Sequence, residues 1–415
     1  MTLLFIKGNF KPFFHYLFTH KHSNSYTSHV MNFYEDKYAD FIIKRMLRLQ
    51  SGEKLSLNCN SETLPFAHKV AHIAAEESGL PVSLVYIENG KVESVDEIEP
   101  SFQVKEQKGV AMLHLASFPE SGKNEELDAK ALQEYRLLAD PIFLDRRISV
   151  PWATAYVPTP LWAEFVYGPG ATTDMLWRDI AELYELEDEE NFDLTDTLEK
   201  SLSIRANKLN SLNLIAFKLE SSTCSLYLPI AKRTKHVTSA TRVNNRFFYP
   251  SFPCEDIAVA IDMRRAEGHF TTTMPFRLFD KIFEHASVNI KEGMVTGFVL
   301  EGGNDYITRF INIDEEAKRV GELILCDNMS RSSLFNRSLG LPVFDRMRGV
   351  SIVLGGVRPE AVTGSDESSL SQEGINTSFA RLELPILSDS LSIIGVDKDN
   401  KETLIMENGS FTEEF

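Results

Sequence analysis

Three short segments in the second half of the sequence carry carboxylates at positions where they could do chemistry. Glu255 and Asp256 follow Pro253 in FPCEDIAVAID, where they are either turn or capping carboxylates or candidate catalytic residues. Glu322 begins the apolar segment ELILC, which is typical of a buried strand. Because an unpaired buried charge is costly, Glu322 needs a partner.

The third segment is TSFARLELPI, residues 377–386, which predicts a β-strand. The two-residue period of a strand places Phe379, Arg381 and Glu383 on one face and Ala380, Leu382 and Leu384 on the other, core-facing one. Arg381 and Glu383 on the polar face form either an ion pair in solvent or part of a site. This strand alone does not decide between the two interpretations.

Composition and charge limit the classes of function. The 415 residues are enough for two domains, and 43% apolar with 25% charged residues is ordinary for a globular protein. The net charge of −17 argues against general binding to nucleic acid or an anionic membrane, because phosphate polymers select clustered Lys and Arg. A cation or a cationic substrate group matches this charge better.

The four cysteines, Cys59, Cys224, Cys254 and Cys326, lie far apart and have no metal-ligand spacing. We therefore expect a reduced, cytoplasmic protein. Cys254 is a poor candidate for a nucleophile, because the acids beside it raise the pKa of its thiol and disfavour the thiolate.

The order of predicted elements divides the chain into three parts. Residues 1–30 contain no acid and are expected to form a disordered or untranslated tail, whose short apolar run suits neither a signal peptide nor a membrane span. Residues 31–212 alternate between helices and strands, which predicts an α/β domain with a helix-covered, largely parallel sheet. Residues 213–415 predict an α+β domain rich in antiparallel strands.

Particular segments carry these predictions. In the first domain, helices are expected at 35–49, 66–78, 128–143 and 196–212, and strands at 53–59, 81–88 and 110–117. In the second domain, Gly302 and Gly303 predict a hairpin between strands at 294–300 and 306–313. The sequence contains no phosphate-binding glycine motif and no GxSxG nucleophile motif.

The order of segments resembles the thermophilic metallo-aminopeptidase family, the group that includes aminopeptidase T, AmpS and PepS. The similar segments are MNFYEDKYADFIIKRML, WATAYVPTPLWAEF, LWRDIAELYEL, RANKLNSLNLIAFKL, SSTCSLYLP, FPCEDIAVAID, EGHFTTTMPF, EEAKRVGELIL, SIVLGG and TSFARLELPI. They cover nearly everything after residue 30 and occur in one order. The resemblance implies an aminopeptidase T-like fold, a homodimer, and release of N-terminal residues from short peptides.

The resemblance also implies two divalent metal ions of the zinc, cobalt, magnesium or manganese class, with a metal-activated water that attacks the N-terminal peptide bond. The family's PTEEVFT segment matches PCEDIAV, which assigns its Glu ligand and its Glu base to Glu255 and Asp256. The family's LGE segment matches VGE and assigns a further metal ligand to Glu322.

Three family positions are substituted. The ligand histidine falls on Ser351, the nearby tyrosine falls at about Arg358, and the His-x-Asp strand becomes Arg381-Leu382-Glu383, which keeps an acidic metal ligand at Glu383. A guanidinium has no lone pair to donate and stays charged at any working pH. It can pair with carboxylates, but it cannot ligate a metal.

Two hypotheses for function follow. In the first, the protein is an aminopeptidase T-like metallo-exopeptidase whose altered, carboxylate-rich site prefers a hard cation. In the second, it is a catalytically inactive homologue that binds peptides or a protein partner and holds no metal. The second hypothesis depends on Arg381, together with Arg346 or Arg358, neutralising the glutamates in place of the metal.

Overall fold

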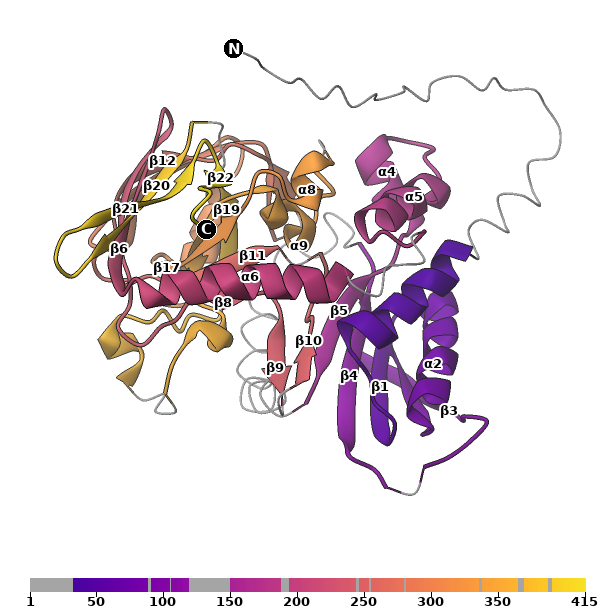
Figure 1. Ribbon diagram of the computed structural model, residues 1–415. Helices are drawn as coiled ribbons and strands as arrows, with labels where there is room; N and C mark the ends of the chain where they lie inside the picture. Colours follow the sequence, from indigo (N-terminus) through magenta and orange to yellow (C-terminus); the bar gives the residue numbers. More distant parts are fainter. Residues whose placement is uncertain are drawn as a thin grey trace, which may run out of the picture.

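The structure is a computed structural model in which a helix-covered sheet formed by the first half of the chain lies beside a group of sheets formed by the second half (Figure 1). The described residues are 33–88, 91–104, 106–118, 150–187, 194–243, 246–253, 255–279, 281–335, 338–364, 369–386 and 390–415. The predicted tail at 1–30 and the predicted helix at 128–143 lie outside these residues.

A five-stranded sheet forms the first half of the fold. Its strands, in the spatial order β3-β2-β1-β4-β5, are β1 (Glu53–Cys59), β2 (Val82–Glu88), β3 (Lys91–Ile98), β4 (Gly109–Ala116) and β5 (Trp152–Tyr156). β1 pairs in parallel with β2 and β4, and β4 with β5, whereas β3 joins the edge antiparallel to β2. The predicted helix-covered, largely parallel sheet is confirmed.

Helix α2 (Leu64–Ser78) connects β1 to β2 and packs against both strands. Its buried side chains Phe66 and Val70 share one hydrophobic core with Leu57 of β1. α2 ends at Gly79, whose φ of 68° lies in the left-handed region that glycine adopts without strain. The predicted helix at 35–49 is observed over residues 33–46, and its last turn is the π-helical segment η1 (Ile42–Met46).

Three helices follow β5 in the sequence: α4 (Pro160–Tyr167), α5 (Thr173–Leu183) and α6 (Leu194–Ser211). The Thr159 side chain caps α4 by accepting a hydrogen bond from the Trp162 backbone N–H. The buried Trp162 indole donates to the carbonyl of Leu339 at 2.8 Å, which ties α4 to the second half. α6 buries Leu202 and Leu209 in the core of that half, along which it lies in Figure 1.

Two antiparallel sheets form most of the second half. The five-stranded sheet has the order β19-β18-β17-β11-β8 and consists of β8 (Val237–Thr238), β11 (Asp256–Ala260), β17 (Val320–Cys326), β18 (Ser351–Gly355) and β19 (Arg381–Pro385). The eight-stranded sheet has the order β16-β15-β12-β7-β6-β20-β21-β22 and consists of β6 (Leu214–Ser221), β7 (Cys224–Pro229), β12 (Glu267–Thr271), β15 (Ala286–Lys291), β16 (Met294–Leu300), β20 (Ser392–Asp397), β21 (Glu402–Glu407) and β22 (Ser410–Phe411). The predicted antiparallel character of this half is confirmed.

Short elements complete the second half. Two small hairpins pair β9 (Thr241–Val243) with β10 (Arg246–Phe248) and β13 (Phe276–Leu278) with β14 (Lys281–Phe283). The short helical elements are α7 (Asn304–Ile311), α8 (Arg331–Leu334), α9 (Pro342–Asp345), η2 (Arg346–Arg348), η3 (Pro359–Ala361) and η5 (Ser371–Glu373).

The predicted hairpin around Gly302 and Gly303 is wrong at its second strand. Residues 304–311 form helix α7, whose buried side chains are Ile307 and Phe310. These buried positions are three residues apart, which matches the helical period and not the two-residue period of a strand. A short apolar run is compatible with both elements before its packing is known.

The division of the chain at residue 212 stays a prediction. α6, which ends just before this point, contacts β8 and β11 of the second half. Among the described helices, none is both long enough and apolar enough to cross a membrane.

Arg246 of β10 and Glu53 of β1 form a bidentate ion pair between the two halves, with N–O distances of 2.9 and 2.8 Å. Replacing one partner leaves the other charge largely buried and unpaired, so we expect Arg246→Gln to lower the free energy of unfolding by about 3 kcal/mol. Urea unfolding measures the change. The matched control, Lys218→Gln, breaks an exposed pair with Glu402 and is expected to have no measurable effect. Equal effects of the two variants would contradict the prediction.

Candidate functional site

The candidate site lies on one face of the five-stranded antiparallel sheet. Alternate residues reach this face: Asp256 of β11, Glu322 of β17, Ser351 of β18, and Arg381 and Glu383 of β19. The intervening residues of the same strands, such as Ile257, Leu323 and Leu382, are buried in the core that the sheet shares with the eight-stranded sheet. The strand period therefore separates the site from the core.

Strand register brings these side chains together. Glu322 pairs with Val353 of β18, and Val353 pairs with Glu383 of β19, so the two acids lie in one row across the sheet. Gly355, two residues after Val353, pairs with Arg381 in the next row of the same face. Of the predicted strand at 377–386, only Arg381–Pro385 is observed, as β19, and residues 377–380 precede it. Arg381 and Glu383 lie on the face that was expected.

Glu322 is the centre of the site and is fully buried. Its Oε1 accepts hydrogen bonds from Arg358 Nε at 3.0 Å and from Arg381 Nη2 at 2.9 Å. Its Oε2 accepts from the Arg358 backbone N–H at 2.7 Å. Two guanidiniums therefore supply the partner that a carboxylate on this strand requires.

The same two arginines bind the neighbouring acids. Arg358 Nη2 donates to Asp256 Oδ2 at 2.5 Å, and Arg381 Nε donates to Glu383 Oε1 at 2.9 Å. Arg381 Nη1 also donates to the carbonyl of Gly356 at 2.9 Å, which fixes the plane of its guanidinium. We name the resulting group the arginine–carboxylate cluster: Asp256, Glu322, Glu383, Arg358 and Arg381.

The ionisation of the cluster follows from these contacts. Burial alone would raise the pKa of Glu322, but Arg381 and Arg358 outweigh burial and lower that pKa to about 2. Burial lowers the pKa of a guanidinium, yet the acids raise the pKa of Arg358 and Arg381 above the ordinary value. Arg346 of η2 adds a third guanidinium, 3.5 Å from Glu383. Three arginines therefore balance three acids.

These residues do not fit the two-metal centre that the family resemblance implies. The oxygens of Glu322 accept from guanidiniums, which occupy them and have no lone pair to share. Across the described residues, no three His, Cys, Asp or Glu side chains meet in an arrangement that could hold a metal ion. Asp256 Oδ1 and Glu383 Oε2 are buried oxygens of the cluster that have no hydrogen-bond partner in the described part of the chain, so their lone pairs are open to a ligand.

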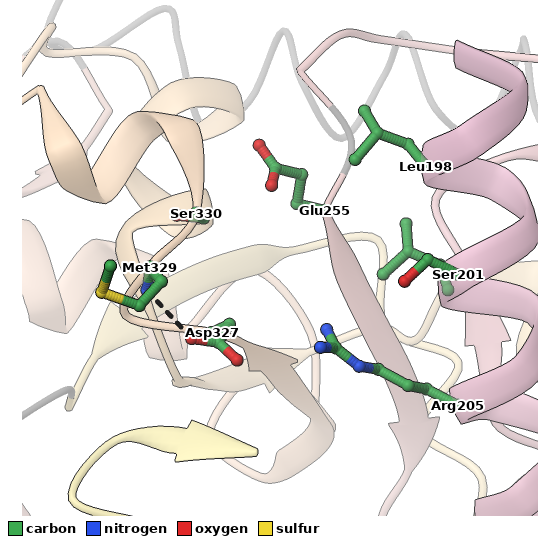
Figure 2. A pocket seen from close by; sticks show the side chains of 8 residues that line it. Leu198, Ser201, Arg205, Glu255, Asp327, Met329 and Ser330 are labelled. Atoms are coloured by element: carbon green, nitrogen blue, oxygen red, sulfur yellow. Dashed lines mark hydrogen bonds between the residues drawn. The ribbon is translucent and has the colours of Figure 1, made fainter. Parts of the chain in front are cut away.

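Glu255 does not join the cluster. It immediately precedes β11, and adjacent residues of an extended chain point to opposite sides, so Glu255 and Asp256 diverge. Glu255 Oε1 accepts from the Arg331 backbone N–H at 3.0 Å, and its side chain lines a cavity beside α6 (Figure 2). Burial raises the pKa of Glu255, and Arg331 offsets only part of this rise. The structure separates Glu255 from Glu322 and Glu383, with which the sequence grouped it.

Sequence reasoning missed Arg331. Its guanidinium donates to Glu185 Oε1 at 2.8 and 3.1 Å, while its backbone N–H holds Glu255. No local pattern identifies this residue, because Glu185 is 146 positions away in the sequence.

Comparison with known proteins places the chain in a family. The model of the family described as thermophilic metalloprotease (M29) matches residues 34–411. The chain is 24% identical to Aminopeptidase 2 of Geobacillus stearothermophilus over 91% of this chain and 97% of that protein. It is 22% identical to Aminopeptidase PepS of Streptococcus thermophilus, again over 91% of this chain and 97% of that protein. The chain therefore belongs to the thermophilic metalloprotease family M29.

A solved structure supports the same architecture. Wild-type AmpT from Thermus thermophilus superposes on this chain with a TM-score of 0.77 and 17% sequence identity, over 92% of this chain and 100% of that one. The predicted aminopeptidase T-like fold is confirmed. The family is a metalloprotease family, so a divalent metal is expected, whereas the cluster at the centre of this chain does not fit one.

The low pKa of Glu322 predicts how stability depends on pH. A carboxyl whose pKa falls from 4.5 to about 2 on folding adds stability above pH 4.5, and this contribution is lost as the pH falls toward 2. The full contribution is about 3 kcal/mol. We expect urea unfolding at about pH 7 and at about pH 2.5, which lie above and below the unfolded pKa of 4.5, to show this loss in the native chain and not in Glu322→Gln. Parallel pH profiles for the two proteins would contradict the assignment.

Proposed function

We propose that this protein is a non-catalytic member of the M29 family that binds peptides at a centre held together by arginines in place of metal. The observation that carries the proposal is the contact of Arg358 and Arg381 with both oxygens of Glu322. A metal ligand donates a lone pair to the metal ion. Glu322 instead accepts hydrogen bonds from two cationic side chains of the protein itself.

The electrostatics of the cluster oppose a metal ion. Two unit charges about 4 Å apart interact by about 4 kcal/mol at an effective dielectric of about 20, and a divalent ion doubles this repulsion from each guanidinium. Arg358 and Arg381 would have to leave Glu322 before a metal could bind. Each would then lose hydrogen bonds in a buried site, which adds to the cost.

Hydrolysis also requires a group that activates the attacking water. A divalent ion lowers the pKa of a bound water toward neutrality and so produces the nucleophile, whereas a guanidinium only orients and stabilises negative charge. Asp256 donates no lone pair to a metal through Oδ2, which accepts a hydrogen bond from Arg358. The cluster can hold a ligand, but it does not generate a nucleophile.

Peptides are the proposed ligands for two reasons. The relatives are aminopeptidases by name, and this chain spans nearly their whole length. In addition, the buried acceptors Asp256 Oδ1 and Glu383 Oε2 match the N–H donors of a peptide amino terminus. A homodimer is carried over from the resemblance and stays a prediction.

A second candidate function is an aminopeptidase that uses a single hard cation. The same two open oxygens favour it, because carboxylate oxygens are the preferred ligands of such cations. The two candidates differ in what Asp256 and Glu383 bind, which a metal-binding measurement separates.

The test compares the native chain with a variant that restores the family's residue types: Ser351→His, Arg358→Tyr, Arg381→His and Glu383→Asp together. After dialysis against micromolar zinc, cobalt, magnesium or manganese, mass spectrometry measures metal bound per chain. We expect no metal above background for the native chain and stoichiometric metal for the restored variant.

Peptide hydrolysis and peptide binding are then measured on both proteins. The proposal predicts that the native chain binds unlabelled dipeptides in calorimetry without hydrolysing them. Stoichiometric metal in the native chain, lost in Glu322→Gln and accompanied by release of N-terminal residues, would overturn the proposal in favour of the one-cation enzyme.

A further inference from the structure

A cavity of about 230 Å³ lies apart from the arginine–carboxylate cluster, between α6 and the loop that follows β17 (Figure 2). Glu255 and Asp327 line it opposite α6, and Arg205 and Ser201 line it from α6. Because the side chains of Glu255 and Asp256 point to opposite sides of the chain, different residues form the cavity and the cluster.

Opposite charges face this cavity without pairing across it. Arg205 Nε donates to the main-chain oxygen of Phe415 at 3.1 Å, and the guanidinium carbon lies 4.8 Å from the centre of the Phe411 ring. These two contacts hold the guanidinium in place. Within the part of the chain that the structure describes, Nη1 and Nη2 of Arg205 have no hydrogen-bond partner. Each can therefore donate to a ligand.

The acids on the other side are held in a similar way. Arg331 occupies only Oε1 of Glu255, and Oε2 has no hydrogen-bond partner among the described residues. Asp327 Oδ1 accepts from the Met329 backbone N–H at 2.9 Å and from the Ser410 hydroxyl at 3.2 Å, and its Oδ2 accepts from the Phe411 backbone N–H at 3.3 Å. Arg331 Nη1 also lies 3.7 Å from Glu255 Oε1, outside the lining of the cavity. Two oriented carboxylates thus face the cavity, and Arg205 is the one cation among its described lining residues.

We propose that this cavity binds an α-amino acid in its zwitterionic form, with the ammonium on Glu255 and Asp327 and the carboxylate on Arg205. A zwitterion pairs with the acids and with Arg205 at once, whereas a simple cation or anion pairs with one side of the cavity and leaves the other desolvated. Charge-assisted hydrogen bonds at both ends also fix the orientation of the ligand.

Size and lining agree with a ligand of this class. Pockets for drug-sized molecules have volumes of about 300–1,000 Å³, so a cavity of about 230 Å³ suits a smaller molecule. Leu198 and Met329 add apolar surface to the wall, which suits an aliphatic or thioether side chain. L-Leucine is therefore the probe of choice.

Isothermal titration of the full chain with L-leucine tests the proposal, with N-acetyl-leucine and leucine amide as analogues that each lack one charge. We expect saturable binding of leucine and roughly tenfold or greater weakening for each analogue. Glu255→Gln should weaken the binding of leucine by a similar factor. Ser201→Phe, at an exposed position of α6 that lines the cavity, should abolish binding by filling it. The matched control is Glu301→Gln, an exposed acid elsewhere, which should bind as the native chain does.

Ser201→Phe keeps the test decisive if Glu255→Gln folds poorly, since it changes no charge and replaces no buried residue. Absence of leucine binding to the native chain would overturn the proposal. Binding that persists in Ser201→Phe, or that is equal for leucine and both analogues, would also overturn it by placing the ligand elsewhere. Because none of these variants alters the arginine–carboxylate cluster, failure here leaves the proposed peptide-binding function intact.

Discussion

The buried charge of Glu322 is the constraint on which the rest of the site depends. It lies in the interior of a central strand, fully excluded from solvent, and its ionised form is stable only beside a positive charge. In a metalloprotease family that charge is expected from metal ions. Here Arg358 and Arg381 supply it, and their remaining donors tie Asp256 and Glu383 into the same group. One buried carboxylate thus explains why two arginines and two further acids gather around it.

The antiparallel sheet turns this constraint into a defined site. Its two-residue period sends apolar residues to the core and polar residues to the opposite face, so the fold needs no change when the polar residues are replaced. The same period separates Glu255 from Asp256 and gives each a different environment. A pair of adjacent acids that looks like one functional unit in the sequence therefore serves two places, the arginine–carboxylate cluster and the cavity beside α6.

Much of this arrangement could be predicted from local pattern. Alternation in TSFARLELPI placed Arg381 and Glu383 on one face, and the apolar context of Glu322 required a partner for it. Long-range contacts could not be predicted from the sequence, because the Arg331 contacts with Glu185 and Glu255 depend on how distant elements pack. The helix at 304–311 was missed because a short apolar run suits either period until its buried face is known.

Anomalous diffraction from crystals grown with zinc tests the central claim most directly. The account predicts that Arg358 and Arg381 remain hydrogen-bonded to Glu322 and that no zinc peak lies within the arginine–carboxylate cluster. A zinc ion bound to Glu322, with the two guanidiniums displaced from its oxygens, would contradict it.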